Sequence, residues 1–244
     1  MKSNILIIIF MFFACVLKAQ NTTEKKVEWD FPTKPGMERW SQFKSMDEMY
    51  DACQIPDDIL KKLDTETLLK ICYDFPAYMS MFFYNSPQAG FNVFFINFNG
   101  IRELFNRKDV GYFMLKKYKS MSFADFNPLW TLENQGRFVY KYEYFEILLA
   151  QPQVIQSLDT NGRIELLKEA LTKFDEKLLR KDLFGGTTFA VNAWIMAKTL
   201  YFENKLIPNF SKSEDIEMSL GSGRLIGYDL MSIYQQSKSY TNGK

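Results

Sequence analysis

Two glutamates are the residues best suited to acid–base chemistry in this sequence. Glu143 and Glu146 lie three positions apart in an aromatic-rich segment, so a helix would place both carboxyl groups on one face. Two such carboxyl groups can act as the acid and the nucleophile of a glycosidase when burial raises one pKa. A solvent-exposed helix face, with Lys141 nearby to balance the charge, explains the same spacing. We favour this second interpretation.

The composition removes most other catalytic groups. The 244 residues include no histidine, which excludes Ser-His-Asp and Cys-His catalysis and removes the commonest ligand of zinc, copper and non-haem iron. The 30 basic and 29 acidic residues give a net charge of +1, so charge does not indicate nucleic acid as a partner. We therefore expect no cofactor and no nucleic-acid partner, and we favour a protein without enzymatic activity.

The N-terminus has the pattern of a secretory signal peptide. After a lysine, the apolar run Ile5–Leu17 has 13 residues, which is too short to span a bilayer and suits the core of a signal peptide. We expect cleavage after Ala19 and export to the periplasm, the cell surface or the medium, with no transmembrane helix in the mature chain. Lipidation of Cys15 is the alternative, which the bulky Phe12 and Phe13 disfavour.

Export would place Cys53 and Cys72 in an oxidising compartment. A disulfide between them would close a short loop and add about 3 kcal/mol to the free energy of unfolding in the loop-entropy model. Two free, buried thiols that pack as small apolar groups explain the positions equally well, because Cys72 continues the apolar stripe of Leu68 and Leu69. The sequence leaves both possibilities open.

Hydrophobic periodicity predicts helices throughout the body of the chain. The clearest example is 88–107, where seven apolar residues recur at helical spacing and predict one amphipathic helix in spite of Gly100. No segment shows the sustained alternation that is typical of strands. Side chains able to cap helix N-termini mark the starts of other helices: Ser45 with Glu48, Asp64 or Thr65, and Asp159 or Thr160. A further, aromatic-rich helix is expected to start at about Thr131 or Arg137.

These elements predict an all-α fold with four segments. They are a signal peptide over 1–19, an aromatic-containing arm over 20–44, a helical domain over 45–202, and a polar segment over 203–244. We expect the last segment to be a poorly ordered tail or the start of a further region, and its deletion to leave the melting temperature nearly unchanged. For the helical domain we expect an irregular, solenoid-like stack of antiparallel hairpins, with a closed globular bundle as the alternative.

Several stretches resemble uncharacterised exported helical proteins of gut-type anaerobic bacteria. They are Met49–Leu60, Leu68–Cys72 with Phe75-Pro76, and Asn99–Phe105, together with Lys18-Ala19-Gln20 at the end of the signal peptide. The resemblance covers about residues 1–200 and implies export and a helical fold. It brings no known activity and no functional residues.

The function that fits these observations is binding. We expect an exported, non-enzymatic helical protein that recognises a protein or glycan partner through one face, because stacked helical hairpins create extended concave surfaces. One alternative is a carboxylate-dependent glycan hydrolase that uses Glu143 and Glu146. Another is a structural accessory region whose activity lies in a companion domain or protein.

Overall fold

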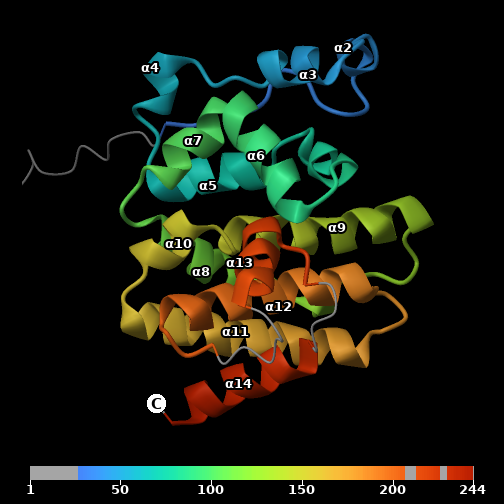
Figure 1. Ribbon diagram of the computed structural model, residues 1–244. Coiled ribbons are helices and arrows are strands. Elements are labelled where there is room, and N and C mark those ends of the chain that lie inside the picture. Colours follow the sequence, from blue (N-terminus) through green and yellow to red (C-terminus); the bar gives the residue numbers. More distant parts are fainter. Residues whose placement is uncertain (1–26, 207–212, 226–229, 244) are drawn as a thin grey trace, which may run out of the picture.

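The chain folds into an all-α structure, as the sequence predicts. The computed structural model in Figure 1 describes residues 27–206, 213–225 and 230–243, and all regular structure in these ranges is helical. The predicted signal peptide, its cleavage site after Ala19 and the alternative lipidation site Cys15 lie outside the described residues.

The helices follow one another with short connections. In Figure 1 the N-terminal helices α2 to α4 lie at one end of the molecule and α14 lies at the other. The helices are α2 (Glu38–Ser41), α3 (Met46–Ala52), α4 (Asp57–Leu60), α5 (Thr65–Tyr73), the 3₁₀ helix η1 (Tyr78–Phe83), α6 (Pro87–Asn97), α7 (Asn99–Phe105), α8 (Val110–Ser120), the 3₁₀ helix η2 (Phe123–Asp125), α9 (Leu132–Leu149), α10 (Pro152–Ser157), α11 (Thr160–Leu179), α12 (Gly186–Phe202), α13 (Ser213–Ser222) and α14 (Leu230–Asn242).

Helices begin where the sequence places capping side chains. The hydroxyl oxygen of Ser45 accepts a hydrogen bond from the backbone N–H of Glu48 at 3.2 Å, and the Glu48 carboxylate accepts one from the backbone N–H of Lys44 at 2.8 Å. Both bonds satisfy N–H groups that have no partner within a helix. The caps of α5, α9 and α11 act through their side chains in the same way: Asp64, Thr131 and Asp159. These predicted helix starts are confirmed.

The single helix predicted over 88–107 is in fact two helices. Phe98 has extended backbone (φ −121°, ψ 117°) and separates α6 from α7. Its buried ring lies 4.7 Å from the ring of Phe75 and 5.6 Å from that of Phe94, between centroids. At Gly100 an added Cβ would lie only 2.5 Å from the Phe98 ring, so the glycine permits this close approach. Packing of Phe98 in the core, which periodicity does not encode, thus accompanies the break.

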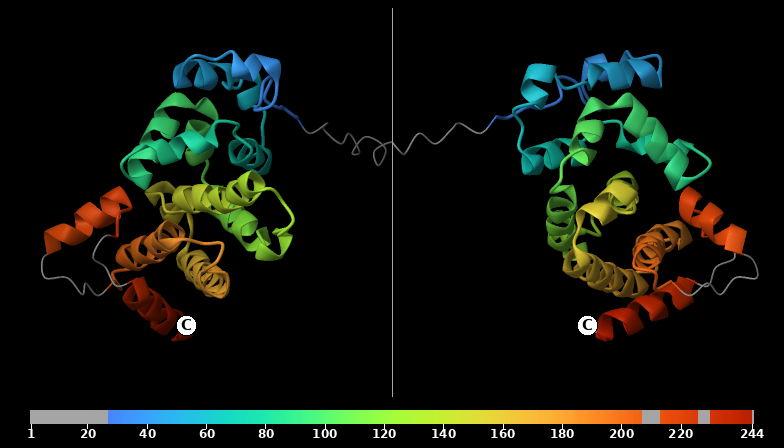
Figure 2. Two further views of the ribbon diagram at one scale, coloured as in Figure 1. Left: turned by 90° about the vertical axis from the view of Figure 1, so that its right-hand side faces the viewer. Right: turned by 60° about the vertical axis from the view of Figure 1, so that its left-hand side comes forward.

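Helix α12 is the central helix of the C-terminal half. It packs against α9, α10, α11, α13 and α14, and in Figure 2 the later helices, coloured yellow to red, gather around it. Its buried side chains include four consecutive residues, Val191 to Trp194, which point in all directions around the helix. In a solenoid each unit contacts only its neighbours along the chain. The structure therefore does not confirm a solenoid-like stack, and this half matches the globular alternative.

Two helices lie in the segment for which the sequence predicts little order. The indole N–H of Trp194 in α12 donates to the backbone carbonyl of the buried Leu220 in α13 at 2.7 Å. In α14, the hydroxyl of Tyr234 donates to Asp175 at 2.8 Å, and its ring lies 5.2 Å from that of Phe174. The Ser- and Gly-rich composition gives no indication of this packing. A few apolar residues in each helix are enough, because α11 and α12 provide the apolar surface against which they pack.

The two cysteines of the helical domain are free and buried. Of the two possibilities that the sequence leaves open, the structure therefore shows the two buried thiols and not the disulfide. Cys53 caps the C-terminal end of α3, whereas Cys72 lies within α5, where its carbonyl accepts a hydrogen bond from Tyr144 at 2.6 Å. Burial raises the pKa of the Cys53 thiol to about 12 and raises that of Cys72. Both thiols therefore stay protonated and pack as small apolar groups.

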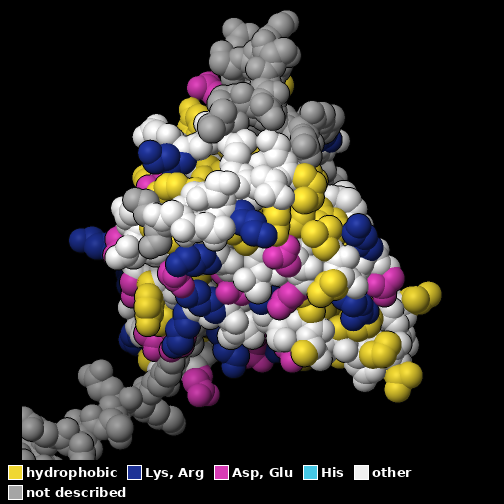
Figure 3. All heavy atoms as spheres, turned by 90° about the horizontal axis from the view of Figure 1, so that it is seen from below, with side chains coloured by type: hydrophobic (Ala, Val, Ile, Leu, Met, Phe, Trp, Pro, Cys, Tyr) yellow, Lys and Arg dark blue, Asp and Glu magenta, His cyan; other side chains and the backbone are white. Residues whose placement is uncertain are grey.

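No described helix has both the length and the apolar composition needed to cross a membrane. On the face shown in Figure 3, basic and acidic side chains are mixed with apolar ones. This face therefore offers no broad field of one sign for attracting a charged polymer.

Candidate functional site

An aromatic and basic pocket lies between the end of α5, η1, the end of α8 and the first half of α9. We call it the Lys141 pocket. Its volume is about 600 Å³, which is within the usual range for small-molecule sites. Five aromatic and three basic residues dominate its lining, which consists of Tyr73, Tyr78, Trp130, Phe138, Tyr142, Lys117, Arg137, Lys141, Asp125, Asn134, Ser120, Met121 and Ser122.

Lys141 projects from α9 into a cage of tyrosine rings. Its ammonium group donates a hydrogen bond to the backbone carbonyl of Tyr73 and lies 4.6 Å from the centre of the Tyr73 ring and 4.1 Å from that of Tyr78. These are cation–π distances. Burial lowers the pKa of Lys141 to about 8; the negative charge of Asp74 opposes this effect, and the positive charge of Lys117 adds to it. The ammonium form therefore still predominates at pH 7.

Two of the three basic residues of this pocket form no ion pair in the described part of the chain. The ammonium group of Lys117 lies 4.5 Å from the centre of the Tyr73 ring. Neither Lys117 nor Lys141 forms an ion pair with a carboxylate in the described part of the chain, whereas Arg137 is paired with Glu133 at 2.8 Å. Two ammonium groups on Tyr73 are therefore available to an anionic ligand.

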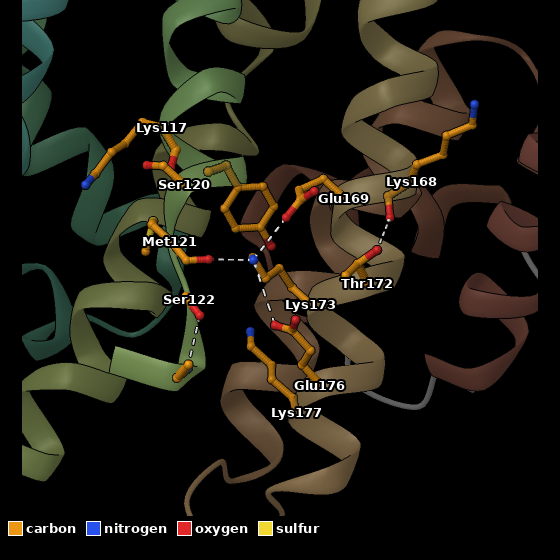
Figure 4. A network of polar contacts seen from close by, with 12 residues as sticks. Lys117, Ser120, Met121, Ser122, Lys168, Glu169, Thr172, Lys173, Glu176 and Lys177 are labelled. Atoms are coloured by element: carbon orange, nitrogen blue, oxygen red, sulfur yellow. Dashed lines mark hydrogen bonds and ion pairs between the residues drawn. The ribbon is translucent and has the colours of Figure 1, made fainter. Parts of the chain in front are cut away.

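The buried Lys173 holds the segment after α8, which forms one wall of the pocket, against α11. The ammonium group of Lys173 in α11 donates to the backbone carbonyl of Met121 at 2.6 Å and pairs with Glu169 at 3.0 Å and with Glu176 at 3.8 Å (Figure 4). These contacts join α11 to the segment after α8 that lines the pocket. Lys117 points away from this network in Figure 4, and so its charge is free to act on the pocket.

A second buried network surrounds Glu146. The ammonium group of Lys177 donates to the two carboxylate oxygens of Glu146 at 2.7 and 2.6 Å, and to the carbonyl of Thr188 at 3.2 Å. Tyr118 and Asn192 donate to the same carboxylate at 2.7 and 3.0 Å. The Glu146 and Lys177 side chains are 0% exposed, and the network joins α8, α9, α11 and α12. Glu146 thus holds the helices together and is out of reach of a polymeric substrate.

Glu143 is buried beside this network. It is 6% exposed, which corrects the interpretation of the two glutamates as a solvated face. Burial raises the pKa of Glu143 to about 7, and the negative charge of Glu146 adds to the effect while Lys177 opposes it. The helix does place both carboxylates together, as predicted from their spacing, but neither of them lines the Lys141 pocket.

The raised pKa of Glu143 predicts a pH-dependent gain in stability when the residue is made neutral. Below about pH 4.5 the carboxyl group is protonated in both the folded and unfolded chains, so it adds no penalty. As the pH rises to 7, the unfolded chain releases the proton first and the folded state loses stability. We expect Glu143→Gln to raise the free energy of unfolding by up to about 3 kcal/mol at pH 8.

Urea denaturation of the wild type and of Glu143→Gln at pH 4, 6 and 8 measures this gain. The difference between the two proteins should shrink toward pH 4. A difference that is the same at all three pH values would show that the Glu143 carboxyl group titrates normally.

The Lys141 pocket has no signature in the local sequence. Its residues come from several elements, so no local motif contains them: Tyr73 ends α5, Trp130 precedes α9, and Lys141 lies within α9. The available signal was the group of aromatic residues around Lys141 at positions 138 to 145, which the sequence interpretation treated only as the surroundings of Glu143 and Glu146.

The chemistry that the pocket offers is recognition. The rings of Trp130 and Phe138 can stack on a flat ligand, and the ammonium groups of Lys117 and Lys141 can bind a carboxylate. The described residues hold no group of three or more cysteines and carboxylates that could bind a metal. Comparisons of the chain with protein-family models, with curated proteins and with solved structures give no match.

Proposed function

We propose that this chain is an exported, non-enzymatic helical protein that binds an acidic glycan in the Lys141 pocket. The observation that carries the proposal is the pair of ammonium groups, Lys117 and Lys141, that lie on the Tyr73 ring without an ion-pair partner in the described part of the chain. An acidic sugar supplies the carboxylate that these groups lack. Charge-assisted hydrogen bonds of this kind are among the strongest polar contacts in proteins.

The rest of the pocket supports a sugar as the ligand. Trp130 and Phe138 add apolar rings to the lining, which suit the C–H face of a pyranose. Asp125 and Asn134 add acceptor and donor atoms for hydroxyl groups. A volume of about 600 Å³ fits one or two sugar units, whereas protein partners are usually bound over broader, flatter surfaces.

The hydrolase alternative has less support. It requires two carboxyl groups that face the same substrate, whereas Glu143 and Glu146 are buried and Glu146 is paired with Lys177. Export rests on the signal-peptide pattern and on the resemblance to exported helical proteins. It would bring the pocket into contact with cell-wall, host or dietary glycans.

Calorimetric titration with matched acidic and neutral oligosaccharides tests the proposal. Suitable pairs are digalacturonate with galactobiose and sialyllactose with lactose. We expect at least one acidic sugar to bind about 10-fold or more tightly than its neutral partner, which corresponds to about 1.4 kcal/mol. Lys141→Met should remove most of this preference, because methionine keeps the apolar stem and loses the charge.

Lys198→Met is the matched control. Lys198 also lies over an aromatic ring, 4.3 Å from the centre of Trp194, and burial lowers its pKa to about 8, but it lines a different pocket. Its replacement should leave the affinity for the acidic sugar unchanged. Equal affinity of the wild type for acidic and neutral sugars, or no binding of either class, would contradict the proposed function.

A further inference from the structure

A second pocket, of about 640 Å³, is formed by α6, α10, the end of α12 and α13. We call it the Lys198 pocket. Its apolar part includes Phe91, Phe95, Ile155 and Leu220. The hydrogen bond from the indole of Trp194 to the carbonyl of Leu220, at 2.7 Å, fixes α13 as one of its walls. The pocket is therefore built from packed helices and not from a surface loop.

One cation in this pocket has no partner within the described residues. The ammonium group of Lys198 lies over the Trp194 ring and forms no hydrogen bond or ion pair with another described side chain. Burial alone lowers its pKa, to about 8, so most of the population is charged at pH 7. An ammonium group withdrawn from water without a counter-ion is unfavourable. A bound anion would relieve this cost.

Three amide side chains, Gln88, Asn92 and Gln151, line the same pocket as this cation. Gln88 donates through its NH₂ group to Asn92 at 2.9 Å and to Gln151 at 3.1 Å, and Gln151 donates to the carbonyl of Ile147 at 2.8 Å. The carbonyl oxygen of Gln88 and the NH₂ group of Asn92 form no hydrogen bond with any described residue. One free acceptor and one free donor complement a peptide group, which offers an N–H and a carbonyl.

We infer that the Lys198 pocket binds the C-terminal end of a peptide whose last residue is apolar. The terminal carboxylate pairs with Lys198, the last peptide group bonds to Gln88 and Asn92, and the apolar side chain enters among Phe91 and its neighbours. A fatty acid shares the carboxylate and the apolar part. However, its hydrocarbon chain would cover the amides without giving them hydrogen bonds, which is costly. The inference does not depend on the glycan proposal, which concerns another pocket.

Calorimetric titration with three probes tests this inference. They are acetyl-Ala-Ala-Phe with a free carboxylate, the same peptide as its C-terminal amide, and dodecanoate. We expect the acid peptide to bind at least about 10-fold more tightly than the amide, in line with the strength of charge-assisted pairs. Lys198→Met should abolish the preference, and Lys141→Met should leave it intact. Lys198→Arg, which keeps the charge, should retain part of it.

The comparison of the affinities of the wild-type protein for the acid peptide and for its amide remains valid even if a variant fails to fold. Equal affinity for the two peptides, or binding of neither, would overturn the inference. Tighter binding of dodecanoate than of the acid peptide would assign the pocket to fatty acids and would also overturn it. None of these outcomes affects the result expected from the titrations with acidic sugars. The proposals for the two pockets can therefore be rejected independently of each other.

Discussion

Replacing Glu146 by glutamine is expected to lower the free energy of unfolding by about 3–5 kcal/mol at pH 7. Glutamine keeps the shape of the side chain and an acceptor for Tyr118 and Asn192, but it removes the negative charge that balances Lys177. The ammonium group would then be buried without a counter-ion. The loss is bounded near 5 kcal/mol, because Lys177 can release its proton at a cost of about 1.4 kcal/mol per pH unit below 10.5.

Glu143→Gln is the matched control for this experiment, because it is the same substitution one turn earlier on α9. It should stabilise the protein at pH 8, whereas Glu146→Gln should destabilise it. Urea denaturation of both variants measures the two signs. If Glu146→Gln were as stable as the wild type, the buried pair with Lys177 would not hold the helices together in solution.

Ending the chain after residue 229 is expected to lower the melting temperature by about 10 °C. The truncation removes α14, whose Ile233 and Tyr234 are buried against α11 and α12. Two such side chains contribute about 3–6 kcal/mol, and 1 kcal/mol shifts the melting temperature of a chain of this size by about 2–4 °C. Removal also exposes Phe174, which is 2% exposed in the intact chain.

Differential scanning calorimetry of the truncated chain distinguishes between two expectations for the melting temperature. The composition of residues 203–244 predicts nearly no change, whereas the packing of α14 predicts a large decrease. Tyr234→Phe is the control, since it keeps the ring beside Phe174 and loses only the hydrogen bond to Asp175. It should cost about 1 kcal/mol. An unchanged melting temperature after truncation would show that α14 does not stabilise the helices beneath it.

Local signals in the sequence were sufficient for the helix starts. Ser45, Asp64 and Asp159 cap helices as predicted, because an N-cap depends on residues within one turn. Of the two starts predicted for α9, Thr131 and Arg137, the structure shows Thr131. The break at Phe98 was not predictable in this way. It accompanies the packing of this ring against Phe75, and that contact depends on the arrangement of distant helices.

For the candidate sites too, features within one helix were predictable from the sequence, whereas features that depend on distant helices were not. The spacing of Glu143 and Glu146 correctly placed them on one helix face, but their burial depends on α11 and α12, which supply Lys177 and Asn192. The sequence likewise contains the aromatic residues of α9, but the cage around Lys141 needs α5 and η1 as well. Sites that combine residues from several helices could therefore be recognised only from the three-dimensional structure.

The pH dependence of ligand affinity tests the central claim most directly, because that claim assigns acidic-sugar binding to the charge of Lys141. The affinity of the tightest-binding acidic sugar should be measured by calorimetry at pH 7 and at pH 9.5. In the free protein the pKa of Lys141 is lowered to about 8, so its ammonium form is lost across this interval while an ordinary lysine stays charged. We predict that the affinity falls by about 10-fold or more at pH 9.5, and that Lys141→Met shows no such fall. An affinity of the wild-type protein that is the same at both pH values would contradict the account.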